Sequence, residues 1–497
     1  SRVTIRQVFK TIVWPRRKII LVGLILIVIS RLASLVLPLS SKYLVDDVIS
    51  NADLQMLKYL LAAVIAAITV QAITSFLLTK LLSVEAQHLI SVLRAQVQKQ
   101  ILRLPVRFFD NEKSGALVSR IMTDVEGVRN LVGTGLVQLI GGMLSAIISL
   151  VMMINISSMM TLLVLIPVII FGLISLKAFS YIRPIFRERG VINAEVTGRL
   201  TETLNGIRVI KGFNAEAQEV RTFEAGVEKL FLNVKKSLTS TSLVTSSATF
   251  LLGLASVCIM GIGGYMIIDH ELTLGDFLSF TLFLGFMIAP IVQMSNIGSQ
   301  LTEAFAGLDR TEEIMNMTPE DDGTKRTVSI GKIRGDIEFR NISFAYEEGK
   351  NVLNNINFLA PAGSVTALVG TSGSGKTTIA GLAASFLNAT EGVITVDGTD
   401  LSLVKLESYR SQLGVVLQDD FLFEGTIREN ILFPRPDATK ESLLAAVNAA
   451  YVNEFTDRFE KGLDTVIGER GVKLSGGQRQ RIAIARAILA DPRILIL

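Results

Sequence analysis

Six long apolar runs occupy the chain up to about Leu308, and no run of this kind follows. Each has about 18–21 residues, the length that a helix needs to cross about 30 Å of hydrocarbon. Beyond Asp309, short apolar stretches alternate as the strands and helices of an α/β domain do. We therefore expect a six-helix membrane domain over residues 1–310, a polar linker over 311–333 and an α/β domain over 334–497. The expected spans are Ile19–Leu37, Tyr59–Leu78, Leu136–Ile154, Met159–Leu176, Ala248–Ile268 and Phe277–Met294.

The distribution of Lys and Arg indicates which side of the membrane each connection faces. The connections 46–53, 155–158 and 269–275 contain neither residue, whereas the other side is rich in both. Positively charged connections stay in the cytoplasm, so we expect the N-terminus and the α/β domain there. The stretch Thr4–Val13 suits a helix at the inner membrane surface with Trp14 at the interface, or simply the frayed start of the first span.

The two long cytoplasmic connections carry apolar residues at helical spacing. After the second span this spacing continues from Val84 until Pro105 stops it, and residues 179–240 behave similarly. We expect two long helical hairpins that project from the membrane, with tips near Asn111–Asp124 and Lys211–Glu219.

The α/β domain contains a glycine-rich loop that is typical of phosphate binding. Val365–Val369 predicts a short strand, residues 370–377 fit G-x-x-x-x-G-K-[ST], and a helix is expected from Thr378. Glycines let backbone amides wrap closely around phosphates, and the helix N-terminus adds a partial positive charge. Lys376 is expected to reach the β- and γ-phosphates, and the Thr377 hydroxyl to coordinate Mg²⁺.

Further motifs resemble those of the ATP-binding cassette domain. The signature "LSGGQ" begins at Leu474, Gln418 lies between the loop and the signature, Tyr346 precedes the loop, and Glu469 precedes the signature. With six preceding spans, the whole chain resembles the half-transporters of the type IV ABC exporters, a group that includes bacterial multidrug and lipid exporters. The resemblance implies an ATPase, with ATP and Mg²⁺, that moves a hydrophobic or amphipathic compound across the bacterial inner membrane.

The resemblance also assigns roles to individual residues. Tyr346 would stack on adenine, Gln418 would contact Mg²⁺ and the attacking water, and Ser475 would bind the γ-phosphate in a partner's site. Lys376, Gln418 and Ser475 are the expected catalytic residues, and Thr377 and Gln418 are the expected metal ligands. The expected nucleotide-binding set is Tyr346, Gly370, Thr371, Ser372, Gly373, Ser374, Gly375, Lys376, Thr377, Thr378, Gln418, Ser475, Gly476, Gly477 and Gln478.

One cassette and six spans on one chain imply a dimer, either of identical chains, which the undegraded signature favours, or with a related half-transporter. ATP would lie between the loop of one cassette and the signature of the other, where the helix after Ser475 offers a second N-terminus to the γ-phosphate. Hydrolysis would then weaken the closed state. The hairpin tips and Glu469 are expected to couple the cassettes to the membrane helices, although Glu469 also fits a solvated loop carboxylate.

Ionisable and polar residues inside the spans are the candidates for contact with the substrate. Arg31 lies about 20 Å along the first span from Lys18. It suits an anionic substrate, but it could equally pair with a carboxylate or extend to the interface. Gln71, Gln138 and Gln293 could line a polar cavity or bond neighbouring helices.

The lipid A flippases of this family carry basic residues in the second, third and sixth spans, facing the anionic headgroup. The corresponding positions here hold Gln71, Gln138 and about Ile288. We therefore expect a hydrophobic drug or a less charged lipid, rather than a lipid A-like substrate.

Composition and architecture narrow the alternatives. Six spans exclude a soluble nucleic-acid ATPase, and a single cysteine, Cys258, excludes an intrachain disulfide. An importer is disfavoured because importers usually keep membrane and ATPase domains on separate chains. An ATP-gated channel or regulator on the same scaffold stays open, since sequence separates it poorly from an exporter.

The apolar run Ile494–Leu497 predicts a buried strand. In the family, this strand leads into an Asp that holds Mg²⁺ through water and a Glu that acts as general base. We therefore expect the cassette to continue past Leu497 with the residues that hydrolyse ATP.

Overall fold

The structure, a computed structural model, describes residues 14–112, 117, 118, 120–347, 349–417, 421–468 and 474–497. The chain divides into two compact units. The membrane unit comprises Ser1–Val97 and Val118–Glu313, and the cassette unit comprises Gln98–Leu117 and Ile314–Leu497. Residues 98–117 thus pack with the cassette, although they lie between two spans in the sequence. The predicted helix Thr4–Val13 lies outside the described residues.

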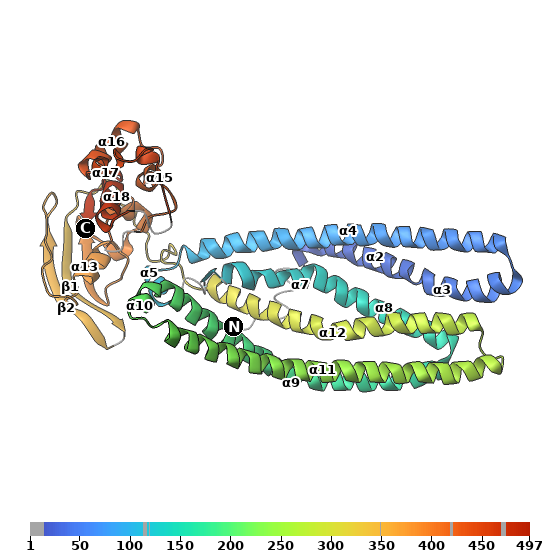
Figure 1. The fold of residues 1–497 in the computed structure, drawn as a ribbon. Helices are drawn as coiled ribbons and strands as arrows, with labels where there is room; N and C mark the ends of the chain where they lie inside the picture. The colour runs from blue at the N-terminus through green and yellow to red at the C-terminus, as the bar shows by residue number, and fades with distance from the viewer. Residues whose placement is uncertain (1–13, 113–116, 119, 348, 418–420, 469–473) are drawn as a thin grey trace. The chain divides into compact units, whose positions relative to one another are not determined.

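Long helices build the membrane unit (Figure 1). In the described part of the chain, six helices are long and apolar enough to cross a membrane, which confirms the predicted number of spans. In chain order the elements are η2 (Trp14–Arg16), α2 (Arg17–Ser34), α3 (Val36–Tyr43), the π-helical η3 (Leu44–Ile49), α4 (Leu54–Ile101), η4 (Arg120–Asp124), η5 (Val125–Gly127), α7 (Val128–Val132), α8 (Thr134–Ile156), α9 (Ser158–Asn205), α10 (Ile207–Gly212), α11 (Glu216–Ile268) and α12 (Leu274–Met315).

The three longest of these helices extend far beyond the length of a membrane span. Helices α4 and α9 have 48 residues each and α11 has 53, so each is about 70–80 Å long. Helices α9 and α11 run side by side and are joined through α10 (Figure 1). Near this tip, Glu219 pairs with Arg199 and accepts a 3.0 Å hydrogen bond from the Thr203 hydroxyl. The predicted extension of the helices beyond the spans is confirmed.

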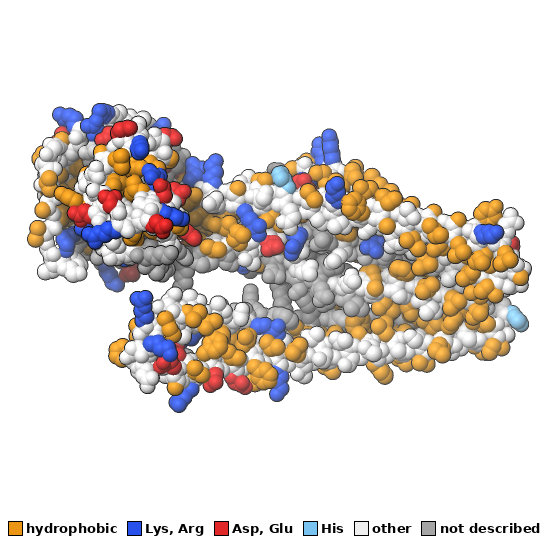
Figure 2. Space-filling view, turned by 45° about the horizontal axis from the view of Figure 1, so that its top comes forward, with side chains coloured by type: hydrophobic (Ala, Val, Ile, Leu, Met, Phe, Trp, Pro, Cys, Tyr) orange, Lys and Arg blue, Asp and Glu red, His pale blue; other side chains and the backbone are white. Residues whose placement is uncertain are grey.

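Large apolar side chains cover the outer surface of the membrane unit. Ile65, Phe76, Leu162, Phe250 and Met260 are each more than 60% exposed. Figure 2 shows such side chains gathered along the long helices, while charged side chains gather on the cassette and near α10. An apolar surface of this extent is unfavourable in water and is what contact with lipid requires.

The first half of the cassette is built on an antiparallel sheet with strand order β2-β1-β3-β4. Ile337 pairs with Ala360 across the first ladder and with Val396 across the second. Behind the sheet, α13 contributes Leu382 to a core that also holds Tyr409, whose hydroxyl donates a 2.6 Å hydrogen bond to the Ala383 carbonyl. The elements are β1 (Ile337–Glu347), β2 (Lys350–Ala360), α13 (Lys376–Ala383), β3 (Glu391–Val396), β4 (Thr399–Asp400), η6 (Leu401–Leu403) and α14 (Leu406–Arg410).

The second half of the cassette is mostly helical. Ile427, Val447 and Ile482 from three of its helices share one buried cluster. Strand β8 pairs in parallel with β5, so the strand predicted at the C-terminal apolar run is present. It is not buried as predicted, since Leu495 is 46% exposed. The remaining elements are α5 (Val106–Asn111), β5 (Leu413–Val415), β6 (Gly425–Thr426), α15 (Ile427–Leu432), α16 (Lys440–Ala449), α17 (Asn453–Thr456), η7 (Gly462–Asp464), β7 (Val466–Ile467), α18 (Gly476–Leu489) and β8 (Ile494–Ile496).

The strand predicted at Val365–Val369 is not formed. The segment makes no ladder with any described strand, and Val365 and Val369 are 99% and 93% exposed. A strand needs a hydrogen-bonded neighbour, which an apolar pattern alone does not supply. This correction leaves the glycine-rich loop attached to extended but unpaired backbone.

Candidate nucleotide site

The glycine-rich loop leads directly into α13, which begins at Lys376, two residues before the predicted start. Gly373 and Gly375 have φ angles of +82° and +89°, in a region that only glycine adopts without strain. A Cβ on Gly375 would also lie 2.6 Å from Leu353 Cδ2. Backbone conformation and space therefore both require glycine where the loop becomes helix.

Lys376 is folded back onto its own loop. Its Nζ donates hydrogen bonds to the carbonyl oxygens of Gly370 at 3.0 Å and Thr371 at 2.7 Å, and it lies 3.4 Å from Ser374 Oγ. The loop itself is exposed. Since an ammonium group bonds more strongly to a phosphate oxygen than to a neutral carbonyl, these carbonyls are exchangeable partners for Lys376.

Tyr346 places an aromatic ring beside the start of α13. Its hydroxyl lies 3.1 Å from the buried Thr378 Oγ1, and its ring packs edge-on against Phe344 with 4.8 Å between the ring centroids. The side chain is 43% exposed. The structure thus brings the predicted adenine contact next to the predicted phosphate loop.

Helix α5, which follows the long α4, reaches this tyrosine within the cassette unit. The Arg107 guanidinium donates a hydrogen bond to the Tyr346 carbonyl. Gln100 Nε2 bonds the Met317 carbonyl at 2.8 Å, and the Glu320 amide bonds the Arg103 carbonyl at 2.7 Å. No local sequence pattern indicates these contacts, because they join segments more than two hundred residues apart.

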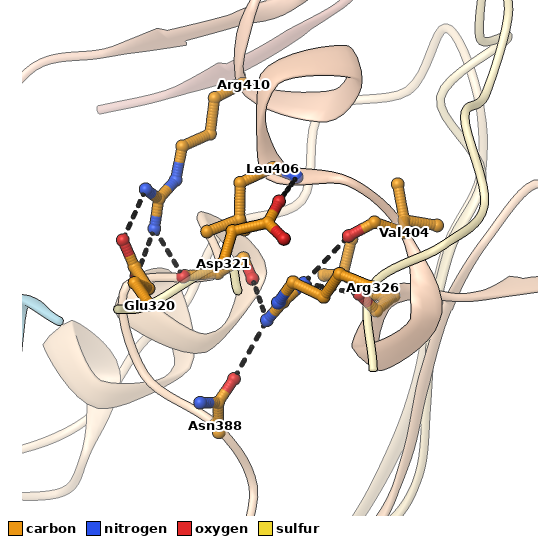
Figure 3. Close-up of polar contacts among 9 residues, drawn as sticks. Glu320, Asp321, Arg326, Asn388, Val404, Leu406 and Arg410 are labelled. Carbon is orange, nitrogen blue, oxygen red and sulfur yellow. Dashed lines mark hydrogen bonds and ion pairs between the residues drawn. The ribbon is translucent and has the colours of Figure 1, made fainter. Parts of the chain in front are cut away.

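The segment predicted as a linker is anchored to the cassette by charged side chains (Figure 3). Arg326 is 6% exposed and donates to the carbonyls of Leu401 and Val404 at 2.9 and 3.0 Å. The same guanidinium also bonds Ser385 Oγ and Asn388 Oδ1. All of these contacts lie within the cassette unit, so this part of the polar stretch is fixed to the domain that follows it.

Two further contacts fix the same segment. Glu320 forms a two-pronged ion pair with Arg410 at 2.9 and 2.7 Å, and Asp321 accepts a 3.1 Å hydrogen bond from the Leu406 amide. Because the Glu320 backbone also bonds Arg103, which follows α4, the linker also contacts the stretch 98–117 within the cassette unit.

The signature forms the exposed N-terminus of α18. Ser475 Oγ accepts a 3.3 Å hydrogen bond from the Gln478 amide, and the Ser475 amide donates to Gln478 Oε1 at 2.8 Å. This reciprocal capping box orients the first turn, which Gly476 and Gly477 begin. Gln478, predicted as a nucleotide contact, therefore also caps the helix, a role that the S-x-x-Q spacing could have indicated.

Two predicted residues, Gln418 and Glu469, lie outside the described residues. Where side chains are described, no three acidic, His or Cys residues cluster as a metal site. Thr377 has an exposed position next to Lys376. A hydroxyl beside a phosphate loop fits Mg²⁺, which proteins usually hold with few ligands together with substrate phosphates.

Polar contacts join the first and last spans of the membrane unit near the end of α3. Asp46 bonds the Thr273 hydroxyl and, at 2.9 Å, the Gly275 amide, while Lys42 pairs with Asp276 at 2.7 Å. A Cβ on Gly275 would lie 2.6 Å from the Lys42 carbonyl, so glycine is needed for this close approach.

A domain with a phosphate-binding loop and a capped "LSGGQ" helix, preceded by six spans, defines an ABC transporter. The chain matches two family descriptions, the ABC transporter transmembrane region over residues 20–291 and the ABC transporter domain over residues 353–497. This chain belongs to the ABC transporter family, whose cassettes are ATPases that drive translocation.

Individual relatives agree with this assignment. The chain is 34% identical over 496 residues to YgaD of Bacillus subtilis, an ATP-binding/permease protein to which multidrug export is ascribed provisionally; 97% of this chain and 84% of YgaD are covered. It is 34% identical to the ATP-dependent lipid A-core flippase of Syntrophus aciditrophicus, covering 94% of this chain and 77% of the flippase.

A solved structure supports the fold. A bacterial Atm1-family ABC exporter with ATP bound has a TM-score of 0.82 to this chain at 24% identity, covering 97% of this chain and 85% of that one. The fold is therefore that of an ABC exporter with a helical membrane domain and a C-terminal cassette.

Proposed function

We propose that the chain is half of an ATP-driven exporter or flippase for a hydrophobic or amphipathic compound, in the inner membrane of a bacterium. The observation that carries this proposal is the pairing of an exposed phosphate loop with six spans on one chain. Multidrug export and lipid A-core flipping, named for two relatives, set the chemical range of the substrate.

The expected active assembly contains two copies of this chain. Lys376 and Thr377 of one copy would hold the β- and γ-phosphates and Mg²⁺, with adenine on Tyr346. The exposed α18 N-terminus of the other copy, at Ser475 and Gly476, would bind the γ-phosphate through its amides and helix dipole. Mg²⁺ would neutralise charge on the phosphates, and Gln418 is the expected contact to the attacking water.

Two exposed aromatic features support the association of two copies. Phe213, at the tip after α10, is 80% exposed. On the cassette, Phe421, Phe423 and Phe433 form a partly exposed patch with ring centroids 5.1 and 4.9 Å apart. We expect Phe213 of one copy to bind this patch on the other, so that cassette closure moves α9 and α11.

The test is ATPase activity in nanodiscs across a panel of lipids and amphipathic drugs. The proposal predicts basal ATP hydrolysis that a subset of these amphiphiles stimulates. Hydrolysis that responds to none of them, together with ATP-gated ion conductance in planar bilayers, would favour a channel on the same scaffold.

A further inference from the structure

Arg31 is a charged residue of the membrane unit, and the binding and hydrolysis of ATP do not explain its presence there. It lies on α2, within the candidate span Trp14–Ile49, about 21 Å along the helix from Arg17. An ionised side chain at such a depth is unfavourable unless it has a partner, and such residues usually face the interior of a helix bundle.

The position of Arg31 on α2 agrees with an interior location. The buried residues of this helix include Gly23 and Ile27, at four-residue spacing before Arg31. Ile27 is 1% exposed and packs with Leu82 of α4. Because residues four apart share one face of a helix, Arg31 extends the buried face of α2 and is itself half-buried.

Helix α8 leaves space for the guanidinium at Gly141. A Cβ on Gly141 would lie 2.9 Å from Arg31 Nε and 2.9 Å from one of its terminal nitrogens. At the next residue, Gly142, a Cβ would lie 3.0 Å from the Cβ of Pro290 on α12. Two adjacent glycines thus bring α8 against both α2 and α12, and Arg31 lies at the first of these contacts.

No group in the described part of the chain neutralises Arg31. Its guanidinium has no hydrogen bond or ion pair with any described residue. Helix α8 carries no charged residue. The first carboxylate after Arg31 in the chain, Asp46, lies about 22 Å further along the helical path and already bonds Thr273 and Gly275.

Two buried hydroxyls that follow Gly141 on α8 also have no partner in the part of the chain that the structure describes. Ser145 and Ser149 are 3% and 0% exposed, and neither Oγ has a hydrogen-bond partner among the described residues. At 100° per residue they lie about 40° and 80° around α8 from Gly141, between the face that meets α2 and the face that meets α12. In the described part of the chain, Arg31 thus lies against Gly141, and two hydroxyls without a described partner lie on the sector of α8 between Gly141 and the α12 contact.

We propose that Arg31, seated against Gly141, binds the phosphate or carboxylate head group of the amphiphile that the protein moves. This inference rests on the proposed function and names its substrate class. A guanidinium offers two parallel donors to a phosphate or carboxylate, and a single cation among uncharged neighbours suits a head group with one anionic centre. The apolar helix surfaces around it suit the acyl or alkyl part.

The experiment measures binding and ATPase stimulation separately, using the intact protein in phosphatidylcholine nanodiscs. Dodecyl phosphate is compared with dodecanol, which has the same chain without the charge, and phosphatidylglycerol in the bilayer tests a lipid source of the same head group. Native mass spectrometry reports binding. We expect dodecyl phosphate, phosphatidylglycerol or both to bind at least about tenfold more tightly than the uncharged amphiphile, as loss of one charge-assisted contact implies.

Arg31→Gln should abolish this preference, and Arg31→Lys should keep part of it. Arg17→Gln, which removes a charge from the exposed start of the same helix, is the matched control and should leave the preference unchanged. Gly141→Ala retains the charge but displaces the guanidinium, so it should weaken the preference for the charged amphiphile severalfold. If Arg31→Gln does not fold, this variant tests the role of Arg31 instead.

An equal preference in Arg31→Gln and the unmodified protein, or equal losses in Arg17→Gln and Arg31→Gln, would overturn the inference. Arg31-dependent binding without any stimulation of ATPase would leave the inference standing and count against the proposed function. ATPase stimulation that is equal for charged and uncharged amphiphiles would support the proposed function and count against the inference about Arg31.

Discussion

Two positively charged side chains, Lys376 of the cassette and Arg31 of the membrane unit, differ in what surrounds them. Lys376 of the cassette has two carbonyl oxygens of its own loop within 3.0 Å. Arg31 of the membrane unit lies against Gly141 and has no acceptor among the described residues. The first site holds its cation ready for exchange with a phosphate, whereas the second depends on a ligand for its counter-charge.

The comparison shows why the ATP site is easier to identify than the substrate site. Phosphates are bound by backbone amides and one lysine. This binding requires glycines at fixed spacing, which can be recognised in the sequence. An amphiphile is held mainly by apolar helix faces, and the specific contact is a single residue whose surroundings come from distant helices. Four predictions, in order of decreasing effect, test this contrast.

Lys376→Ala should lower ATP turnover by about a hundredfold or more, because the variant loses the cation that stabilises charge on the transferred phosphate. Steady-state phosphate release from the protein in nanodiscs measures this. Lys350→Ala, at an exposed lysine of the same domain that pairs with Glu347, is the control and should retain full activity. Comparable activity in both variants would remove the loop from the mechanism.

Arg326→Ala should destabilise the cassette by about 3 kcal/mol, because it leaves buried carbonyl and amide oxygens without their donor. Differential scanning calorimetry of the intact protein should show an earlier cassette transition. Arg334→Ala removes a largely exposed arginine directly after this segment and should change stability by less than about 1 kcal/mol. Similar shifts for the two variants would mean that Arg326 does not anchor the segment.

Arg107→Ala should raise the KM for ATP about fivefold with little change in kcat, because Arg107 bonds the carbonyl of the residue expected to contact adenine. Arg107→Lys should recover part of the affinity, since an ammonium can still donate to that carbonyl. The measurement is the ATP dependence of turnover in nanodiscs. A fall in kcat at unchanged KM would place Arg107 in coupling rather than in adenine positioning.

Lys42→Met should have the smallest effect, a loss of about 1 kcal/mol or less from one ion pair. The pair with Asp276 joins α3 to the start of α12, so its loss should favour separation of these two segments. Distance distributions between spin labels at Ser50 and Glu271, recorded by electron paramagnetic resonance, test this. An unchanged distribution in nucleotide-free protein would show that the Asp46 contacts alone hold the two helices.

Much of the fold could be predicted from the sequence because its signals are local. Spans follow from the length of apolar runs, and the helix extensions from spacing that continues until Pro105. The prediction of a strand at Val365–Val369 is wrong because strand pairing depends on neighbours that a local pattern does not specify. The anchoring of Arg326 and Glu320 was missed for the same reason, since a polar stretch reads as a free linker until its distant partners are known.

For the candidate site, the sequence located the phosphate loop and the signature but not their connections. The motif implies a glycine at position 375, and the structure adds two reasons for it, the positive φ angle and the close approach of Leu353. The link from Arg107 to Tyr346 has no such motif. Arg31 is a candidate from its place in a span, but the absence of a partner among the described residues depends on how α2, α8 and α12 pack.

ATP-dependent translocation tests the central claim most directly. Proteoliposomes would contain the protein with its cassettes facing outward, a fluorescent phosphatidylglycerol analogue and a membrane-impermeant quencher. We predict that ATP and Mg²⁺ change the fraction of analogue that is accessible to the quencher, and that Lys376→Ala abolishes this change. The same change in Lys376→Ala, or in the absence of ATP, would contradict an exporter powered by this cassette.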